Sequence, residues 1–196
     1  MSSVLLKLKF KGNRNYLHGS DIYNTVVREL SLRNGGRLKR LAFRSFSRTQ
    51  VLLCWDTPGE GSIKVGQGQW IADSGSEFPF WIIETQVSII EAYAFDEPSI
   101  VSKASIRDET LICDYHLGYS PIENIIALTK RLAYHLMPVS SGKWIFGQLD
   151  LEADIDRDFR SIVIERQGHI ANRFMRCSIH LDGAFVGNIR FILGNP

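Results

Sequence analysis

The sequence predicts an α+β fold made of two repeats, each a long helix wrapped by an antiparallel sheet. Two observations lead to this prediction. Helical periodicity is strongest in two segments, which start near residues 20 and 120, and each follows a strand pattern and precedes several β-rich segments. The two junctions between strand and helix can also be aligned with each other. A chain of 196 residues is long enough to bury such a core.

The composition is typical of a soluble globular protein, with 44 % hydrophobic and 22 % charged residues. No apolar run approaches the roughly 20 residues that a transmembrane helix needs. The N-terminal VLLKLKFKG is too short and too alternating for a signal peptide. We therefore expect a cytoplasmic protein that does not enter a membrane.

The first repeat is expected over residues 1–105. Apolar residues alternate with lysines from Leu6 to Lys11, which predicts a strand with one buried face. From Ser20 the apolar residues recur at helical spacing, and Asn34-Gly35-Gly36 ends the helix. Ser20 or Asp21 fits the N-cap. Four β-rich segments follow: RLKRLAFRSF, TQVLLCWD, SIKVGQGQWIADS and FWIIETQVSIIEAYAF.

The second repeat is expected over residues 106–196. A strand, ETLICDY, precedes a helix from Ser120 to Met137, and Pro138 ends this helix. Ser120 and Glu123 form a Ser-x-x-Glu capping box, with a proline between them that suits the first helical position. The strands that follow are KWIFGQLDL, FRSIVIER, NRFMRCSIHL and AFVGNIRFIL.

The two helix starts share residues at nearly constant separation, which suggests an internal repeat. The matches are Tyr16 with Tyr115 and Gly19 with Gly118 at 99 residues, then Ser20 with Ser120, Ile22 with Ile122 and Asn24 with Asn124 at 100. One inserted residue, Tyr119, accounts for the change. The common order of elements is the better support for a duplicated unit of roughly 95 residues.

This arrangement resembles the hot-dog superfamily in its tandem, or double hot-dog, form. The resemblance covers nearly the whole chain at the level of element order. It implies a dehydratase, hydratase or thioesterase that acts on acyl groups carried by coenzyme A or acyl carrier protein, in a tunnel between two hot-dog units. We expect dehydratase-, isomerase- or thioesterase-like chemistry and no cofactor. It also implies that polar catalytic groups lie near the start of the central helix, which is HGSDIYN in the first half and GYSPIEN in the second.

No catalytic residue is carried over by a motif. The sequence lacks the Gly-His-Phe-Pro run of fatty-acid dehydratases, the Asp-x-Asn-Pro-x-His run of hydratases and the Asp-x-x-Gly-His-x-Asn type of thioesterase run. The resemblance therefore leaves open whether the protein is an enzyme.

Three residues are candidates for catalysis: His18, Asp21 and His116. His18 is placed at a helix N-terminus, where the helix dipole favours the neutral imidazole, and it could remove a proton next to a thioester carbonyl or activate water. Asp21 could orient His18 or act as a second acid or base, while free amides of the first helical turn could stabilise an oxyanion. His116 lies near the equivalent place in the second half. The alternative is that both stretches only cap a helix and form a turn.

Basic residues are concentrated near the N-terminus. Residues 1–50 contain eleven Lys or Arg and two acids, a net charge of +9, so that the remainder carries −7. Such a surface would attract the phosphates of coenzyme A or an acidic carrier protein. The two charged halves can equally complement each other within one chain or across a homodimer. The residues predicted to contact a carrier or substrate are Arg14, Arg37, Lys39, Arg40 and Arg44.

Two other functions stay open. The protein could be a non-catalytic binding module whose cavity is filled by Trp70, Trp81, Trp144 and phenylalanines. It could also be a ferredoxin-like RNA-binding protein, since KLKFKGNRNY mixes bases with aromatic residues. RNA ranks below the other partners because the chain lacks an RNP-like aromatic strand and its net charge is only +2.

No metal site is expected. The five histidines are scattered, and the three cysteines lack the close spacing of a zinc site. We expect Cys54, Cys113 and Cys177 to be buried free thiols.

Overall fold

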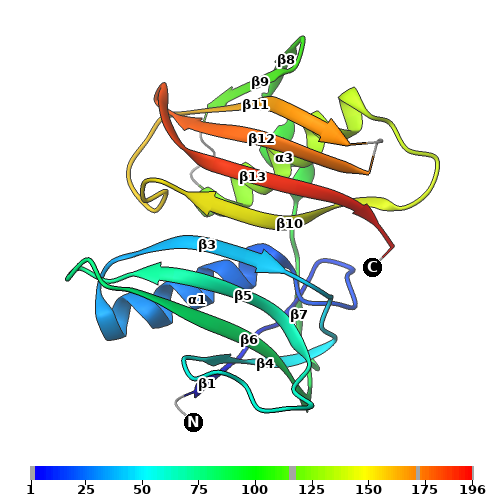
Figure 1. The fold of residues 1–196 in the computed structure, drawn as a ribbon. Helices are drawn as coiled ribbons and strands as arrows, with labels where there is room; N and C mark the ends of the chain where they lie inside the picture. The colour runs from blue at the N-terminus through cyan, green and yellow to red at the C-terminus, as the bar shows by residue number, and fades with distance from the viewer. Residues whose placement is uncertain (1–2, 115–117, 171–172, 196) are drawn as a thin grey trace. The chain divides into compact units, whose positions relative to one another are not determined.

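The computed structural model describes residues 3–114, 118–170 and 173–195. The chain divides into two compact units, Met1–Phe95 and Asp96–Pro196. Both units combine an antiparallel sheet with a helix of 16 residues, so the predicted α+β class is confirmed (Figure 1). Among the described residues no helix is long and apolar enough to span a bilayer.

The first unit contains a five-stranded sheet, one helix and a pair of short strands. Its sheet has the order β1-β4-β6-β5-β3 with every pair antiparallel, whereas β2 and β7 pair in parallel. The elements are β1 (Ser3–Leu6), β2 (Phe10–Lys11), α1 (Gly19–Asn34), β3 (Arg37–Phe43), β4 (Thr49–Cys54), β5 (Lys64–Ile71), β6 (Glu77–Ser88) and β7 (Ala92–Tyr93).

Helix α1 buries one face against the first unit's core. Ile22, Val26 and Leu30 recur every four residues and are all buried, as the periodicity predicts. The helix ends where Gly35 and Gly36 take positive φ angles of 58° and 89°. A Cβ at Gly36 would lie 2.0 Å from the Ile71 carbonyl oxygen, so only glycine fits this close approach.

The second unit contains a six-stranded antiparallel sheet of order β10-β13-β12-β11-β9-β8 and two helices. Figure 1 shows α3 behind this sheet. The elements are α2 (Glu97–Val101), β8 (Ser105–Arg107), β9 (Thr110–Asp114), α3 (Pro121–Leu136), β10 (Lys143–Leu151), β11 (Ser161–Ile170), β12 (Phe174–Leu181) and β13 (Ala184–Gly194).

Helix α3 begins as the sequence predicts. Ser120 is its N-cap, and the Glu123 carboxylate accepts a hydrogen bond of 2.8 Å from the Ser120 amide, which confirms the capping box. Consecutive residues 124–129 are all buried, so this helix is covered on more than one face.

Each of the two long helices, α1 and α3, also has a buried tryptophan at its C-terminal end. In the first unit, the indole Nε1 of Trp70 donates to the carbonyl of the C-cap residue Gly35 over 2.7 Å. In the second unit, Trp144 donates to the carbonyl of the C-cap residue Met137 over 3.1 Å. Both indoles therefore satisfy a carbonyl that a helix end leaves without an intrahelical partner.

The two units share an element order but not a strand order. In both, a strand precedes the long helix and four sheet strands follow it. In the second unit β11, β12 and β13 are neighbours in sequence order, whereas in the first unit β6 lies between β4 and β5. The first unit therefore contains a crossover, residues 55–63, that the second unit lacks.

Several sequence predictions for the first unit were wrong. The alternating run from Leu6 to Lys11 is not one strand, because β1 ends at Leu6 and β2 begins at Phe10. Lys11, expected on the exposed face, is wholly buried. The last predicted strand is also too long, since β6 ends at Ser88 and a separate strand of two residues, β7, follows.

The predicted N-cap of α1 was also wrong. His18 is the N-cap, with extended backbone angles of φ −82° and ψ 138°, and Ser20 lies inside the helix. Ser120, which was aligned with Ser20, is itself the cap of α3. The two matched serines therefore hold different positions relative to their helices.

Candidate functional site at the start of α1

The start of α1 is fixed by hydrogen bonds on both sides of His18. The Leu17 amide donates to the Ser47 carbonyl over 2.9 Å, and the Leu17 side chain is buried. The His18 carbonyl accepts from the amides of Asp21 and Ile22 over 3.1 and 3.2 Å. These contacts hold the half-buried His18 ring at the N-terminus of the helix.

Lys11 brings a buried positive charge to this helix start. Its side chain is 0 % exposed, and its Nζ donates to Ser20 Oγ over 2.8 Å and to Asp21 Oδ1 over 2.9 Å. A buried ammonium group is strongly destabilising unless it is paired and hydrogen-bonded. Both Ser20 and Asp21 therefore serve to hold Lys11 in place.

Two aromatic residues complete the surroundings of Lys11. Its Nζ lies 4.1 Å from the ring centroid of Phe95 and 5.8 Å from that of Tyr93, within the range of a cation–π contact. The Tyr93 hydroxyl lies 2.9 Å from both carboxylate oxygens of Asp21. The parallel pairing of β2 with β7 brings these residues next to Lys11.

Ser20 connects Asp21 to His18. Its buried Oγ lies 3.1 Å from Asp21 Oδ1 and 2.8 Å from His18 Nδ1. We define the site cluster as Lys11, His18, Ser20, Asp21 and Tyr93. The expectation that Asp21 orients His18 thus has a physical route through the Ser20 hydroxyl.

The single proton of the Ser20 hydroxyl allows two states of His18. If Ser20 donates to Asp21, then His18 Nδ1–H donates to Ser20 and the Nε2 atom is basic. If Ser20 donates to Nδ1, the neutral ring carries its proton on Nε2 and can act as a donor. The Ser20 amide, 3.4 Å from Nδ1, favours the second state. The same imidazole can therefore work as a base or as an acid.

The expected oxyanion site in the first helical turn is smaller than predicted. The amides of Ser20, Asp21 and Ile22 all donate to His18, through Nδ1 or the carbonyl oxygen. Within the described part of the chain, the Gly19 amide is the backbone donor of this turn that has no partner. Any oxyanion bound here would therefore lie between Gly19 and the His18 ring.

No family model and no curated protein matches the chain. Solved structures do match it over nearly its whole length at low identity. A pyran synthase domain from module nine of the sorangicin pathway has a TM-score of 0.52 and 10 % identity, and the match covers 99 % of this chain and 92 % of that one. A dehydratase domain of a mycocerosic acid synthase-like polyketide synthase has a TM-score of 0.51 and 10 % identity, and the match covers 99 % of this chain and 94 % of that one. A candidate thioesterase from Novosphingobium aromaticivorans has a TM-score of 0.51 and 11 % identity, and the match covers 98 % of this chain and 95 % of that one.

The chain has a hot-dog fold. The hot-dog resemblance inferred from element order is thereby confirmed at the level of the fold. This result removes the ferredoxin-like alternative as an architecture. At 10–11 % identity the comparison assigns no residue of this hot-dog protein a role.

The predicted carrier-binding residues of the hot-dog chain lie in two places. Arg14 is next to the site cluster, since its Nη1 donates to the Lys11 carbonyl over 3.0 Å and its guanidinium lies 5.9 Å from the Phe95 ring. The other four, Arg37, Lys39, Arg40 and Arg44, lie on β3 or directly after it.

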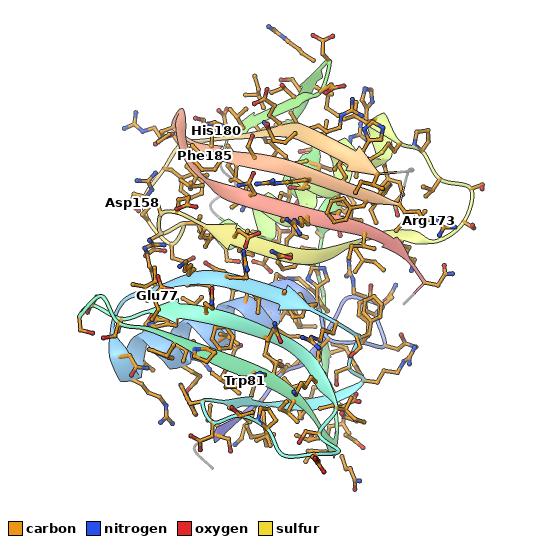
Figure 2. The ribbon with its side chains drawn as sticks, viewed as in Figure 1. Glu77, Trp81, Asp158, Arg173, His180 and Phe185 are labelled. Carbon is orange, nitrogen blue, oxygen red and sulfur yellow. The ribbon has the colours of Figure 1, made fainter. Side chains whose placement is uncertain are left out.

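Lys39 and Arg44 each have a described partner, which makes them less available to an anionic ligand. Lys39 forms an exposed ion pair of 2.7 Å with Glu77, which Figure 2 labels. Arg44 donates to the Gln67 side chain over 2.8 Å. Arg40 is exposed and Arg37 is half-buried.

The third catalytic candidate, His116, lies outside the described residues. On the neighbouring helix α3, the Glu123 carboxylate is used in the capping box. Asn124 is buried, and its Nδ2 donates to the Ser120 carbonyl over 3.1 Å. These polar groups at the start of α3 therefore have clear structural roles.

Cysteines and metal ligands add nothing to the site. Cys54, Cys113 and Cys177 are buried free thiols, as predicted, and burial raises the pKa of each. For Cys177 burial raises the pKa to about 12. Over residues 3–114, 118–170 and 173–195, no group of three or more His, Cys, Asp or Glu could hold a metal ion.

Sequence reasoning missed Lys11 and Tyr93 as members of the site cluster. Lys11 is one of three alternating lysines, and no local pattern distinguishes it from Lys7 and Lys9. Tyr93 lies 72 residues from Asp21 in sequence, so nothing local predicted their contact. Ser20 was considered only as a helix cap.

Proposed function

We propose that this protein acts on acyl thioesters, carried by coenzyme A or acyl carrier protein, with dehydratase-, isomerase- or thioesterase-type chemistry at His18. The observation that carries the proposal is the contact between His18 Nδ1 and the buried network of Ser20, Asp21 and Lys11. The likeness to a polyketide synthase dehydratase domain and to a candidate thioesterase supports the substrate class by analogy of fold.

A dehydration at this site would use His18 first as a base and then, once protonated, as an acid. With Nε2 unprotonated, His18 removes a proton from the carbon next to the thioester carbonyl, and the electron pair moves onto the carbonyl oxygen. The Gly19 amide donates to that enolate oxygen. When the enolate collapses, the 3-hydroxyl leaves and takes the proton from Nε2, which gives water and a 2-enoyl thioester.

The buried network would set the proton position of His18. When the Ser20 hydroxyl donates to Asp21, it accepts from His18 Nδ1–H and Nε2 is the basic nitrogen, while the Lys11 ammonium holds Ser20 and Asp21 in contact. Lys11, Ser20 and Asp21 are therefore positioning residues. General acid–base catalysis by a positioned side chain contributes about 10²–10⁴-fold to rate.

A panel of acyl thioesters tests the proposal. The full chain is incubated with 3-hydroxyacyl-, enoyl- and saturated acyl-coenzyme A and with the same acyl groups on a carrier protein. Thiol release measures hydrolysis, and mass spectrometry measures loss or gain of water. His18→Ala should lower the rate by about 10²–10⁴-fold. The matched control is His169→Ala, because His169 is exposed on β11 and has no partner among the described residues.

The same experiment separates the enzyme from a non-catalytic binding module. Turnover that His18→Ala does not change would exclude His18 as the reactive group. Thioester binding without turnover of any substrate would favour the binding module. In that case the dissociation constant of the thioester for His18→Ala should stay within about twofold of the wild-type value.

Carrier recognition is a further part of this proposal. Arg14, Arg37, Lys39, Arg40 and Arg44 would attract the phosphates of coenzyme A or the acids of a carrier protein. If so, KM should rise with salt while kcat changes little, and Arg40→Gln should reduce that salt dependence.

We also infer that the two units are two hot-dog repeats, with the predicted division near residue 105. The shared order of strand, long helix and four strands supports duplication. An acyl tunnel between the halves and a homodimer stay predictions. Crosslinking by a photoreactive acyl thioester and sedimentation velocity test them.

A further inference from the structure

Two arginines lie directly opposite each other on neighbouring strands of the second unit. Arg176 on β12 is the register partner of Arg190 on β13. In the same row across the sheet, Gly168 on β11 pairs with Arg176, and Gln148 on β10 pairs with Arg190. Like charges directly opposite on antiparallel strands are destabilising, so this arrangement needs a reason.

Neither arginine of this pair is neutralised. Among the described residues neither forms an ion pair with a carboxylate. Arg176 is exposed and has no hydrogen-bond partner there. Arg190 has one long hydrogen bond, from Nη1 to Gln148 Oε1 over 3.4 Å, and its buried Nε has no partner. A ligand on this face could therefore contact only the part of the Arg190 side chain that stays exposed.

The nearby acids do not pair with the two arginines. Asp150 on β10 accepts from the Gln148 side-chain amide over 2.7 Å. Glu165 on β11 accepts from the Gln167 side chain over 3.3 Å. The side chain of Gln148 thus stands between Asp150 and Arg190, donating to one and accepting from the other.

An apolar row lies beside the arginine row on the same sheet face. Register places Ile170, Phe174, Ile192 and Ile145 side by side on β11, β12, β13 and β10. Ile170 is 66 % and Ile192 44 % exposed, so two large apolar side chains of one row, on either side of Phe174, are open to solvent. Phe174 joins the two rows, because its ring centroid lies 5.5 Å from the Arg190 guanidinium carbon.

The sheet face has open space at these rows. A Cβ added at Gly168, next to Arg176, would meet no atom within 4 Å. Figure 2 shows this face, with His180 and Phe185 at the far end of β12 and β13 in an edge contact of 5.6 Å, while α3 covers the opposite face (Figure 1). A small ligand could therefore reach both rows from solvent.

We propose that this face of the second unit binds a phosphate monoester with a short apolar body. The phosphate oxygens accept from the guanidinium groups of Arg176 and Arg190, and the apolar body covers Phe174 and Ile192. Guanidinium groups bind phosphate through paired hydrogen bonds, which suits two arginines held side by side. All residues of this site belong to the second unit, and the proposal does not depend on thioester chemistry.

Isothermal titration of the full chain with hexyl phosphate, inorganic phosphate and hexanol tests the site. At constant ionic strength in chloride buffer, hexyl phosphate should bind at least tenfold more tightly than inorganic phosphate, and hexanol should not bind. Arg176→Gln and Arg190→Gln should each weaken hexyl phosphate at least fivefold. The charge-matched control is Arg131→Gln, because Arg131 is exposed on α3 without a described partner.

Thermal unfolding of each variant without ligand shows whether a loss of binding comes from a loss of folding. Arg176→Gln should unfold at the same or a higher temperature than the wild type, since it removes a like-charge opposition. If Arg190→Gln does not fold, Arg176→Gln alone decides the result. His18→Ala should bind hexyl phosphate normally, so failure of thioester turnover leaves this measurement intact.

Three outcomes would overturn the proposal. One is hexyl phosphate binding that survives both arginine substitutions. Another is inorganic phosphate binding as tightly as hexyl phosphate, because the apolar row would then contribute nothing. The third is a dimer in sedimentation velocity that Arg176→Gln or Arg190→Gln dissociates, because the face would then be an interface with a second copy.

Discussion

The ammonium group of Lys11 lies 2.9 Å from the Asp21 carboxylate, with the lysine wholly buried and the aspartate 11 % exposed. The Tyr93 hydroxyl and the Phe95 ring enclose the pair from β7 and the residues after it. The pair ties three segments of the first unit together, since β2, α1 and β7 each contribute to it. Its disruption should affect stability and the orientation of His18 together.

Removing one partner of this ion pair should lower the free energy of unfolding substantially. Lys11→Met leaves Asp21 with a partly buried charge, and breaking a buried pair typically destabilises a protein by about 3–5 kcal/mol. Urea unfolding followed by circular dichroism measures the loss. Lys39→Met is the control, because its ion pair with Glu77 is exposed and such pairs contribute about 0–1 kcal/mol.

The double variant Lys11→Met, Asp21→Asn tests whether the charge explains this loss. It should recover much of the lost stability, because no unpaired charge remains. Equal stability of the Lys11→Met and Lys39→Met variants would show that the Lys11 charge is solvated in solution.

The indole N–H groups of Trp70 and Trp144 should contribute to the stability of the fold. Trp70→Phe and Trp144→Phe keep an aromatic ring but leave the Gly35 or Met137 carbonyl without its donor, at a cost of about 1–3 kcal/mol from the lost hydrogen bond alone. Replacing the larger ring adds a packing loss. Trp81→Phe is the control, since Trp81 is half-buried on β6 with no described hydrogen bond (Figure 2). Equal midpoints in thermal unfolding for all three variants would contradict the role in capping.

Acid stability should depend on Asp182 in the turn before β13. Hydrogen bonds from the amides of Arg160 and Ser161 to its carboxylate lower its pKa from the usual 3.8. Because the folded pKa lies below the unfolded one, the stabilisation is present above about pH 4 and is lost as pH falls through the folded value.

Asp182→Asn should therefore be less stable than the wild type at pH 7, and the difference should shrink on acidification. Asparagine tolerates the positive φ of 50° at this position, so the turn itself is kept. Urea unfolding at several pH values gives the comparison, with the exposed Asp158→Asn as control (Figure 2). A difference that stays constant with pH would exclude the carboxylate as its cause.

The three thiols should be unreactive in the folded protein. With a pKa of about 12, Cys177 has almost no thiolate at pH 8, and burial shields Cys54 and Cys113 as well. A thiol-specific chromogenic reagent should therefore modify fewer than one cysteine per chain without denaturant and three in urea. Rapid labelling of the native protein would show that one of these sites opens.

Local signals predicted the two long helices, but only His18 and Asp21 of the site cluster as functional residues, and they missed the short helix α2. The Ser-x-x-Glu pattern at Ser120 gave the start of α3 correctly, because a capping box depends only on residues three positions apart. The cap at His18 was not predictable in this way. Ser20 has the right chemistry for a cap, but its hydroxyl is turned toward Lys11, and His18 accepts the amide in its place.

The burial of Lys11 depends on pairing across the whole first unit. Phe10 and Lys11 pair with Ala92 and Tyr93, about eighty residues later, and only that pairing supplies the aromatic ring and hydroxyl around the lysine. An alternating pattern reports which residues share a strand face. It does not report what will cover that face.

The strand order of the first unit bears on when its sheet can assemble. Because β6 lies between β4 and β5, the edge pair β1-β4 and the pair β5-β3 have no direct contact until residues 77–88 arrive. A nascent chain that stops before β6 would hold two separate fragments of a sheet, each with unpaired edges. The second unit can grow strand by strand through the hairpins β11-β12 and β12-β13. We therefore expect the slower folding step, and the greater dependence on chaperones during synthesis, in the half that contains His18.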